Sequence, residues 1–366
     1  MVSENDNKLM LRCTELALKG EYSCKPNPRV GSIIVKDQQI IAEGWHQYAG
    51  ELHAEVDALE KAGSNAEGAS LYVTLEPCSH HGRTSPCCDA IIAAGISKVF
   101  YGMIDPNPKV AGKGISKLKQ AGIEVIGPLM PRQCEDLNPG FIRRMTSGRP
   151  YVRCKMAMSL DGRTAMASGE SQWITGEDSR TDVHRWRAKS SAIITGVESV
   201  LKDDPFLNAR LEHDALIQPL RVICDSQLRT PDSAKTMQIP GHVLLVSASD
   251  RKFGMDKQQT AEVEQVNLPG KNNRTDLAAL LTLLAQEKEC NEVLIEAGPT
   301  LAGAFIEQGL VDELLIYTAP ILLGHQAQPL FKLHGMEKIA DQIKLEFIDV
   351  VSLGKDCRIR SRIDNK

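Results

Sequence analysis

Apolar residues near the N-terminus recur at the spacing of an amphipathic helix. They predict a helix over residues 5–20 that ends at Gly20, since glycine commonly follows the last helical turn. The buried face of this helix should contain Leu9, Cys13, Leu16 and Ala17. Two short apolar runs follow, residues 30–35 and 39–45, and the polar residues between them predict a β-hairpin.

From residue 53 to residue 129 the pattern alternates between helical and extended runs. Helices are predicted at 53–63, 86–95 and 114–122, and strands at 70–77, 97–104 and 123–129. Strands that alternate with helices of this length form βαβ units, in which helices cover both faces of a largely parallel sheet. The fold class expected here is therefore α/β.

A connector and a domain boundary follow this series. Residues 133–145 predict a helical connector, and "TSGRP" at 146–150 combines small residues, glycine and proline, as domain boundaries often do. A second alternating series starts at residue 151 and closes with a β-rich tail. Because 366 residues are too many for one ordinary hydrophobic core, we predict two α/β domains, residues 1–148 and 149–366.

Composition and charge exclude several classes of protein. Hydrophobic residues make up 42% of the chain and charged residues 25%, which is typical of a globular protein. The net charge of −4 argues against the basic surface that nucleic-acid binding needs, but it permits a small basic pocket for one phosphate. The N-terminal residues are polar and acidic, so we expect no secretory signal, and no apolar run is long enough for a membrane span. We therefore expect a cytoplasmic enzyme.

A cluster of soft metal ligands lies at residues 75–88, "LEPCSHHGRTSPCC". A local group of cysteines in a cytoplasmic protein is more typical of a metal or catalytic site than of disulfides. Upstream of it, His53 and Glu55 open a predicted helix. One imidazole and two thiolates are the ligand set of a catalytic zinc site, whose fourth position stays open for water. Glu55 would then transfer protons without binding the metal.

The spacing of the cysteines departs from the zinc-deaminase signature. That signature is His-x-Glu followed by Pro-Cys-x-x-Cys, and His53, Glu55 and the Pro77–Cys78 pair fit it. Eight residues, rather than two, separate Cys78 from the next cysteine. The last ligand is therefore either Cys87 or Cys88.

Local helix chemistry favours Cys87. "TSPCC" predicts a hydroxyl N-cap, a proline at the first helical position and Cys87 in the first turn, where the helix dipole and free N–H groups stabilise a thiolate. Cys88 would point about 100° away around the helix, toward the core. We assign Cys88 and the dispersed cysteines to the hydrophobic interior.

The loop between the cysteine ligands leaves alternatives open. A structural zinc site has four protein ligands, and His80 or His81 could be the fourth, although Glu55 favours the catalytic form. Otherwise His80, His81 and Arg83 line the pocket mouth, where positive charge suits a phosphorylated small molecule. The remaining alternative is a solvated loop with incidental charge.

These motifs resemble the bifunctional deaminase–reductase family of riboflavin biosynthesis. The similar stretches are "PNPRVGSIIV" (26–35), "GWHQYAGELHAE" (44–55), "HAEVDAL" (53–59), "LEPCSHHGRTSPC" (75–87) and "DPNPKVAGKG" (105–114). The resemblance implies a cytidine-deaminase-like α/β/α zinc domain, in which a zinc-activated water attacks an amidine carbon. The 2-amino group of a 2,5-diamino-6-ribosylamino-pyrimidinone 5′-phosphate is thereby removed to give the uracil. The resemblance also implies that Asn27 and His46 contact the pyrimidine, while His80 and Arg83 lie near the substrate.

One feature of the second half predicts a ligand site from the residues alone. In "NEVLIEAGPTLAGAFIEQG" (291–309) a buried strand runs through Gly298 and Pro299 into a helix. Gly298 permits close approach of the backbone, Pro299 suits the first helical position, and the free N–H groups there would face a phosphate. A simple strand–helix turn is the alternative, and the Gly-x-Gly-x-x-Gly fingerprint of a Rossmann domain is not present. Trp173 lies in a polar stretch and could form a stacking surface.

The second half resembles the reductase part of the same family, whose fold is like dihydrofolate reductase. The similar stretches are "KMAMSLDGRTA" (155–165), "SGESQWITG" (168–176), "RAKSSAIITGVESVLKDDPFLNAR" (187–210) and "IEAGPTLAGAF" (295–305). The resemblance implies that NADPH delivers a hydride to the ribosylamino carbon and opens the ribose to ribityl. The residues implied to bind the cofactor are Ala157, Trp173, Ser199, Asp203, Ser226, Gly298, Pro299, Thr300, Leu301, Ala302, Gly303 and Ala304. Those implied to bind substrate are Ser171, Arg187, Leu207, Arg210 and Glu296.

Two of these candidates suggest a specific role. The arginines Arg187 and Arg210 suit the 5′-phosphate of the substrate. Lys155 is a further candidate near the transferred hydride.

Two rival functions fit the sequence less well. A nucleic-acid deaminase would share the zinc motif, but the acidic net charge and the reductase-like second domain argue against it. A zinc-stapled scaffold without activity would not need Glu55 beside His53. We therefore predict a bifunctional enzyme with one Zn²⁺ per chain and NADPH. We expect a phosphorylated ribosylaminopyrimidine substrate, no nucleic-acid or membrane partner, and a homo-oligomer.

Overall fold

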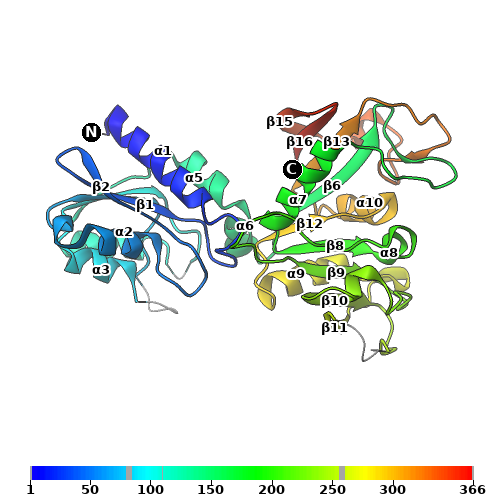
Figure 1. Cartoon of the computed structure of the whole chain (residues 1–366), viewed down its shortest axis with the longest axis horizontal. Coiled ribbons are helices and arrows are strands. Elements are labelled where there is room, and N and C mark those ends of the chain that lie inside the picture. Colours follow the sequence, from blue (N-terminus) through cyan, green and yellow to red (C-terminus); the bar gives the residue numbers. More distant parts are fainter. Residues whose placement is uncertain (1, 80–84, 109, 255–259, 365–366) are drawn as a thin grey trace. The chain divides into compact units, whose positions relative to one another are not determined.

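The computed structural model describes residues 2–79, 85–108, 110–254 and 260–364. The chain forms two compact units: unit 1 is Met1–Gly148 with Ala215–Ile217, and unit 2 is Arg149–Asp214 with Gln218–Lys366. Figure 1 shows the elements of each unit, with unit 1 in blue to cyan-green and most of unit 2 in green to red. Of the helices in the described ranges, none has both the length and the hydropathy of a membrane span.

Unit 1 is built around one sheet. Its strands are β1 (Gly31–Lys36), β2 (Gln39–Trp45), β3 (Ser70–Leu75), β4 (Lys98–Met103) and β5 (Glu124–Ile126). Within the described residues they form a five-stranded sheet in the order β2-β1-β3-β4-β5. β1 pairs antiparallel with β2 and β3, whereas β3, β4 and β5 are parallel. The predicted hairpin and the three later strands are therefore confirmed.

Helices cover both faces of this sheet, as Figure 1 shows for α1 and α5 on one side and α2 and α3 on the other. They are α1 (Glu4–Leu18), α2 (Ala54–Ala62), α3 (Cys87–Ala93), α4 (Lys113–Gln120), α5 (Pro131–Leu137) and α6 (Pro139–Ser147). The predicted face of α1 is buried in the core of unit 1. Burial of these apolar side chains is the main term that stabilises the unit.

Two boundaries in unit 1 differ from the prediction. The predicted connector is two helices, α5 and α6, because Pro139 cannot continue the hydrogen-bond ladder of α5. Helix α1 ends at Leu18 with Lys19 as its C-cap, so Gly20 is not the cap. Gly20 is instead needed for a close approach, since a Cβ there would lie 2.5 Å from the carbonyl oxygen of His46.

Unit 2 is built around a larger sheet. Its strands are β6 (Tyr151–Ser159), β7 (Arg163–Ala165), β8 (Ala192–Gly196), β9 (Leu220–Cys224), β10 (His242–Ser247), β11 (Glu262–Asn267), β12 (Glu292–Ile295), β13 (Glu313–Ala319), β14 (Gln328–Pro329), β15 (Leu345–Leu353) and β16 (Asp356–Ile363). In the part of the chain that the structure describes, nine of them pair in the order β11-β10-β9-β8-β12-β6-β13-β16-β15, while β7 pairs with β14. The strands from β11 to β13 are parallel to one another. β16 is antiparallel to both of its neighbours, β13 and β15.

The helices of unit 2 are α7 (Glu177–Lys189), α8 (Val197–Asp203), α9 (Leu277–Gln286) and α10 (Pro299–Glu307). The central strands are apolar and almost fully buried, as expected where helices cover both faces of a parallel sheet. The parallel order also places the carboxyl ends of β8, β9 and β12 at one edge of the sheet.

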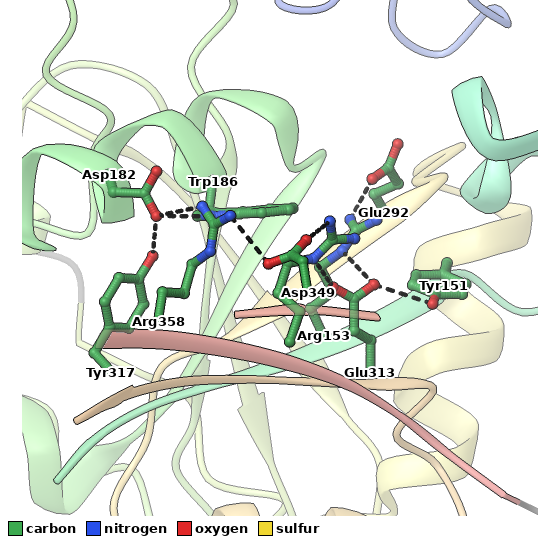
Figure 2. A network of polar contacts seen from close by, with 10 residues as sticks. Tyr151, Arg153, Asp182, Trp186, Glu292, Glu313, Tyr317, Asp349 and Arg358 are labelled. Carbon is green, nitrogen blue, oxygen red and sulfur yellow. Dashed lines mark hydrogen bonds and ion pairs between the residues drawn. The ribbon is translucent and has the colours of Figure 1, made fainter. Parts of the chain in front are cut away.

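A network of buried polar side chains holds α7 on the sheet, and Figure 2 shows it from close by. On α7, Asp182 Oδ2 accepts from the Tyr317 hydroxyl at 2.7 Å and from Arg358 Nη1 at 2.9 Å. It also accepts from the indole nitrogen of Trp186, one turn along the helix, at 3.2 Å. These bonds join α7 to β13 and β16.

The same network continues beneath α7 along the strands. Glu313 accepts from Arg153 Nε at 3.2 Å, from Arg360 Nε at 2.7 Å and from the Tyr151 hydroxyl at 3.1 Å, and Arg153 also pairs with Glu292. Buried charges persist only where they are paired in this way. The network therefore fixes α7, the helix that carries the candidate reductase residue Arg187.

Candidate functional sites

Three side chains from separate elements of unit 1 meet in one cluster. His53 is the N-cap of α2, Cys78 follows β3, and Cys87 is the first residue of α3. Their ligand atoms all lie within 4.8 Å of one another, and among the described residues they form the one such group of three. His53 Nδ1 is 3.0 Å from Cys87 Sγ and 3.6 Å from Cys78 Sγ. One imidazole and two sulfur atoms match the donor preference of Zn²⁺ and leave a coordination position open.

The start of α3 differs from the prediction. Pro86 is the N-cap and makes no side-chain cap, so the predicted hydroxyl N-cap with proline at the first helical position is wrong. Cys87 nevertheless lies in the first turn, and its backbone N–H donates to Cys78 Sγ at 3.2 Å. Cys88 lies in the core of unit 1, where its Sγ is 3.4 Å from the carbonyl oxygen of Pro77. His80, His81 and Arg83 lie outside the described residues.

Glu55 lies one residue into α2, beside the cluster but not part of it. Its side chain is buried, and burial raises the pKa of Glu55 to about 7, with the nearby Cys78 sulfur acting in the same direction. A carboxyl group with a pKa near neutrality can both accept and donate a proton at physiological pH.

The surroundings of the two sulfur atoms shift their pKa values in opposite directions. The hydrogen bond from the Cys87 thiol, together with His53, lowers the pKa of Cys78 to about 4. The same partnership raises the pKa of Cys87. The cluster thus already stabilises one thiolate, which is the form that binds a metal.

Asn27 and His46 lie next to this cluster. Asn27 Nδ2 is 2.9 Å from His46 Nε2, and His46 Nδ1 is 2.9 Å from the carbonyl oxygen of Leu52. The rings of His46 and His53 meet edge to face, with centroids 5.4 Å apart. The carbonyl can only accept, so Nδ1 carries the proton and Nε2 accepts from the Asn27 amide. The Asn27 oxygen is then the end of the amide left for a ligand.

Glu76 is a residue of this site that the sequence analysis missed. Its buried carboxylate accepts backbone N–H groups from Gly112 at 2.9 Å and Gly114 at 3.0 Å, with Asp105 and Ile115 at 3.3 Å. It thereby ties the start of α4 to the segment that carries Cys78. Its place directly before Pro-Cys is the one local sign of it in the sequence, and this sign does not reveal backbone partners 29 to 39 positions away.

In unit 2, candidate residues gather at the carboxyl ends of parallel strands, where ligands of open α/β sheets bind. Glu296 directly follows β12, Ser226 follows β9, and Ser199 lies on α8 after β8. Ser226 Oγ accepts from the backbone N–H of Thr275 at 3.1 Å. The predicted residues Ala157 and Lys155 lie on β6, and Asp203 ends α8.

Arg187 and Glu296 form a bidentate ion pair. Arg187 Nε and Nη2 donate to the two Glu296 oxygens at 2.6 and 2.9 Å, and Arg187 Nη1 donates to the carbonyl oxygen of Asn208 at 3.2 Å. Burial alone would raise the pKa of Glu296, but the charges of Arg187 and Lys155 outweigh it and lower that pKa to about 2. The charge of Arg187 is therefore largely compensated within the protein.

Arg210 has a different environment. It lies in an irregular segment after α8, is exposed, and contacts the ring of His184 rather than a carboxylate. His184 was not predicted from the sequence, where one histidine on a helix carries no distinctive signal. Of the two predicted phosphate-binding arginines, Arg210 has the less compensated charge.

The start of α10 has the predicted local geometry. Gly298 is its N-cap, Pro299 is its first residue, and Gly298 and Thr300 are exposed. A Cβ added to Gly298 would meet no described atom beyond its neighbours within 4 Å, so this backbone is open to a ligand. Ala302 and Gly303, in contrast, are buried, and a Cβ on Gly303 would lie 2.2 Å from the carbonyl oxygen of Lys332.

Other predicted residues lie apart from these contacts. Leu207 is buried among Val183 and Trp186, so only its backbone is available to a substrate. The side chain of Trp173 is 72% exposed, and the Arg180 guanidinium lies 5.0 Å from its ring centroid. Trp173, Ser171 and Leu301 are not joined by a described contact to the Arg187–Glu296 pair.

Comparison with known protein families finds a match in each half of the chain. A family described as the cytidine and deoxycytidylate deaminase zinc-binding region matches residues 3–103. A family described as the RibD C-terminal domain matches residues 150–359. The two matches and the solved relatives below confirm the predicted fold class, a cytidine-deaminase-like zinc domain followed by a reductase domain.

Relatives match this chain over nearly its whole length. The riboflavin biosynthesis protein RibD of Escherichia coli K12 is 47% identical over 363 residues, which cover 96% of this chain and 97% of the relative. The structure of Acinetobacter baumannii RibD (form 1) has a TM-score of 0.91 at 44% identity and covers 99% of both chains.

A Thermotoga maritima structure is described as a diaminohydroxyphosphoribosylaminopyrimidine deaminase/5-amino-6-(5-phosphoribosylamino)uracil reductase. It has a TM-score of 0.87 at 33% identity and covers 98% of both chains. The chain belongs to the RibD family of riboflavin biosynthesis proteins.

Proposed function

We propose that the cluster of His53, Cys78 and Cys87, with Glu55, is the deaminase site of this enzyme. The Arg187–Glu296 pair and Arg210 are then part of its reductase site. The chain is a bifunctional enzyme of riboflavin biosynthesis, with Zn²⁺ and NADPH as its cofactors. We assign the deaminase to residues 1–148 and the reductase to residues 149–366.

The deaminase site binds the metal through three ligands and keeps its acid–base group separate. Zinc held by His53, Cys78 and Cys87 supplies Lewis acidity, which makes the attacking water acidic near neutral pH. Glu55 accepts the proton of that water and donates one to the departing amino group. The substrate is the diaminopyrimidinone ribosylamine 5′-phosphate, and the product is the corresponding uracil.

Recognition of the pyrimidine falls to Asn27 and His46. The hydrogen bond between them fixes the orientation of the Asn27 amide, and its oxygen then accepts from an N–H group of the pyrimidine. His80 and Arg83, which lie outside the described residues, are assigned to the phosphorylated end of the substrate.

The reductase site orients the ribosylamine against the cofactor. NADPH supplies the hydride that converts the ribosyl group to ribityl. The exposed start of α10 and Ser226 line the cofactor side, together with Ala157, Trp173, Ser199 and Asp203. Arg210 binds the 5′-phosphate, Glu296 holds Arg187 and the substrate hydroxyls, and Lys155 lies near the reacting carbon.

The observation that carries this proposal is the convergence of His53, Cys78 and Cys87 within 4.8 Å. The test measures the zinc content and ammonia release of Cys78→Ser beside the matched control Cys134→Ser, a buried cysteine of the same unit. Cys78→Ser should lose bound zinc and ammonia release while keeping NADPH oxidation with the uracil intermediate. If Cys78→Ser kept one zinc per chain, the ligand assignment would be wrong.

Partners and location stay predictions. We propose a cytoplasmic homo-oligomer without a nucleic-acid or membrane partner. The net charge of −4 supports the absence of nucleic acid, and the free state of all ten cysteines supports a reducing compartment.

A further inference from the structure

His184 makes three contacts with Arg210. The backbone nitrogen of Arg210 lies 3.2 Å from His184 Nδ1, while Arg210 Nε and Nη2 lie 3.2 and 3.0 Å from His184 Nε2. The ring thus lies against both the backbone and the guanidinium of the same residue. This contact fixes the start and the end of a long side chain that is otherwise exposed.

The position of His184 is itself well determined. It lies three residues before Arg187 on α7, so both side chains lie on the same side of the helix. Asp182 and Trp186 are on the other side, where the network in Figure 2 holds α7 against β13 and β16. A ring on a helix fixed in this way can orient a side chain that comes from a loop.

The loop around Arg210 is also tied on both sides. The carbonyl oxygen of Asn208 accepts from Arg187 Nη1 at 3.2 Å, and the Gln218 side chain bonds both the N–H and the carbonyl of Ala209 at 3.0 and 2.9 Å. The backbone before Arg210 is therefore anchored. The direction of the Arg210 guanidinium still has to be fixed. Among the described residues, His184 is the side chain that contacts this guanidinium.

We propose that His184 is a positioning residue of the reductase site, which orients the Arg210 guanidinium to bind the 5′-phosphate of the substrate. The inference rests on the proposed role of Arg210. His184 occupies the Nε side of the guanidinium and leaves the Nη1–Nη2 edge, which can donate two parallel hydrogen bonds to a phosphate.

The charges around the ring agree with this role. Burial and then the charges of Arg187 and Arg210 lower the pKa of His184 to about 4, against the smaller opposing effects of Glu296 and the Asn208 carbonyl. The ring is therefore neutral at physiological pH. In the neutral ring Nε2 accepts from the guanidinium and Nδ1 carries the proton, so the positive charge of Arg210 stays uncompensated for the phosphate.

The test compares His184→Leu and His184→Gln in the full chain, with steady-state NADPH oxidation as the readout. The substrates are 5-amino-6-(5-phosphoribosylamino)uracil and its dephosphorylated riboside. His184→Leu should raise KM for the phosphorylated substrate about tenfold with kcat nearly unchanged, and should not change the kinetics with the riboside. His184→Gln keeps a side-chain acceptor and should stay close to wild type. His334→Leu, which removes an exposed histidine of the same unit, is the matched control.

A double-mutant cycle with Arg210→Ala separates the possible failures. If His184 acts through Arg210, His184→Leu should add nothing in the Arg210→Ala background. If Arg210→Ala raises KM but His184→Leu does not, the positioning role is wrong and the proposed phosphate site stands. If Arg210→Ala leaves KM for the phosphorylated substrate unchanged, the proposed role of Arg210 fails first. A loss of kcat in His184→Leu with a shifted pH profile would assign proton transfer, not positioning, to His184.

Discussion

His53 Nδ1 lies 3.0 Å from Cys87 Sγ, although the two residues are 34 positions apart in the chain. The contact exists because α2 and α3 begin at the same end of the sheet of unit 1, and His53 is the N-cap of α2 while Cys87 is the first residue of α3. Cys78 completes the cluster from the loop after β3, and Cys88 points into the core. The fold therefore distinguishes the two adjacent cysteines.

The first prediction concerns these cysteines. Cys87→Ser should strip zinc and abolish ammonia release, because a hydroxyl is a poor substitute for a thiolate ligand. Cys88→Ser should keep close to one zinc per chain, with a loss of stability because a polar hydroxyl replaces a buried thiol. Metal analysis of the two purified variants decides between them, and the reverse pattern would exchange their roles.

The second prediction separates the metal from the acid–base group. Glu55→Gln should retain zinc but lower the rate of deamination by about 10²- to 10⁴-fold, because it removes proton transfer and leaves the ligands intact. Zinc content and ammonia release are measured on the same sample. A variant that had lost its zinc would identify Glu55 as a ligand.

A third prediction follows from the depressed pKa of Glu296. Because that pKa lies at about 2 in the folded protein, below the ordinary value of 4.5, the carboxylate contributes stability that is complete above pH 4.5 and is lost as the pH falls toward 2. The full contribution is about 3 kcal/mol, of which about 1 kcal/mol is lost by pH 3.5.

The measurement for this prediction is chemical denaturation at several pH values. The difference in unfolding free energy between wild type and Glu296→Gln should be constant from pH 7 to 5 and shrink at pH 3.5. Glu346→Gln, on the exposed face of β15, serves as the control. A difference that stays constant down to pH 3.5 would contradict the charge pairing of Glu296 with Arg187.

The fourth prediction is that substitutions in the reductase site impair NADPH oxidation and leave deamination intact. Arg210→Ala should chiefly raise KM for NADPH oxidation with the phosphorylated intermediate, while Glu296→Ala affects KM or kcat, because it releases Arg187 as well. Ammonia release should continue in the double variant, since no ligand of the metal cluster is changed. Loss of ammonia release in a folded, zinc-loaded double variant would contradict the assignment of two separate sites.

Much of the fold was predictable from the sequence because hydrophobic periodicity is a local signal. The hairpin of β1 and β2, the βαβ series of unit 1 and the strand that leads to Gly298 all follow from spacing and from glycine or proline. Helix α7 was missed, because its sequence is rich in charge and the large apolar residues that it buries, Val183 and Trp186, are too few to show a helical period.

The candidate sites were predictable to the extent that their chemistry lies in short motifs. His53, Glu55, Cys78 and the cysteine pair could be named because metal-ligand spacing is distinctive. Glu76 and His184 could not, since their partners lie 29 to 39 and 26 positions away. The helix start at Cys87 was misplaced by one residue, because proline suits both the N-cap and the first turn.

The most direct test of the account is to incubate the enzyme with the diaminopyrimidinone ribosylamine 5′-phosphate and follow ammonia release and NADPH oxidation together. Wild type should release ammonia with or without NADPH, and should oxidise NADPH only after ammonia appears, to no more than one equivalent per ammonia. Glu55→Gln should do neither with this substrate, yet should oxidise NADPH at the wild-type rate when given the uracil intermediate. NADPH oxidation by Glu55→Gln at the wild-type rate from the diamino substrate would contradict the order of two separate reactions in this chain.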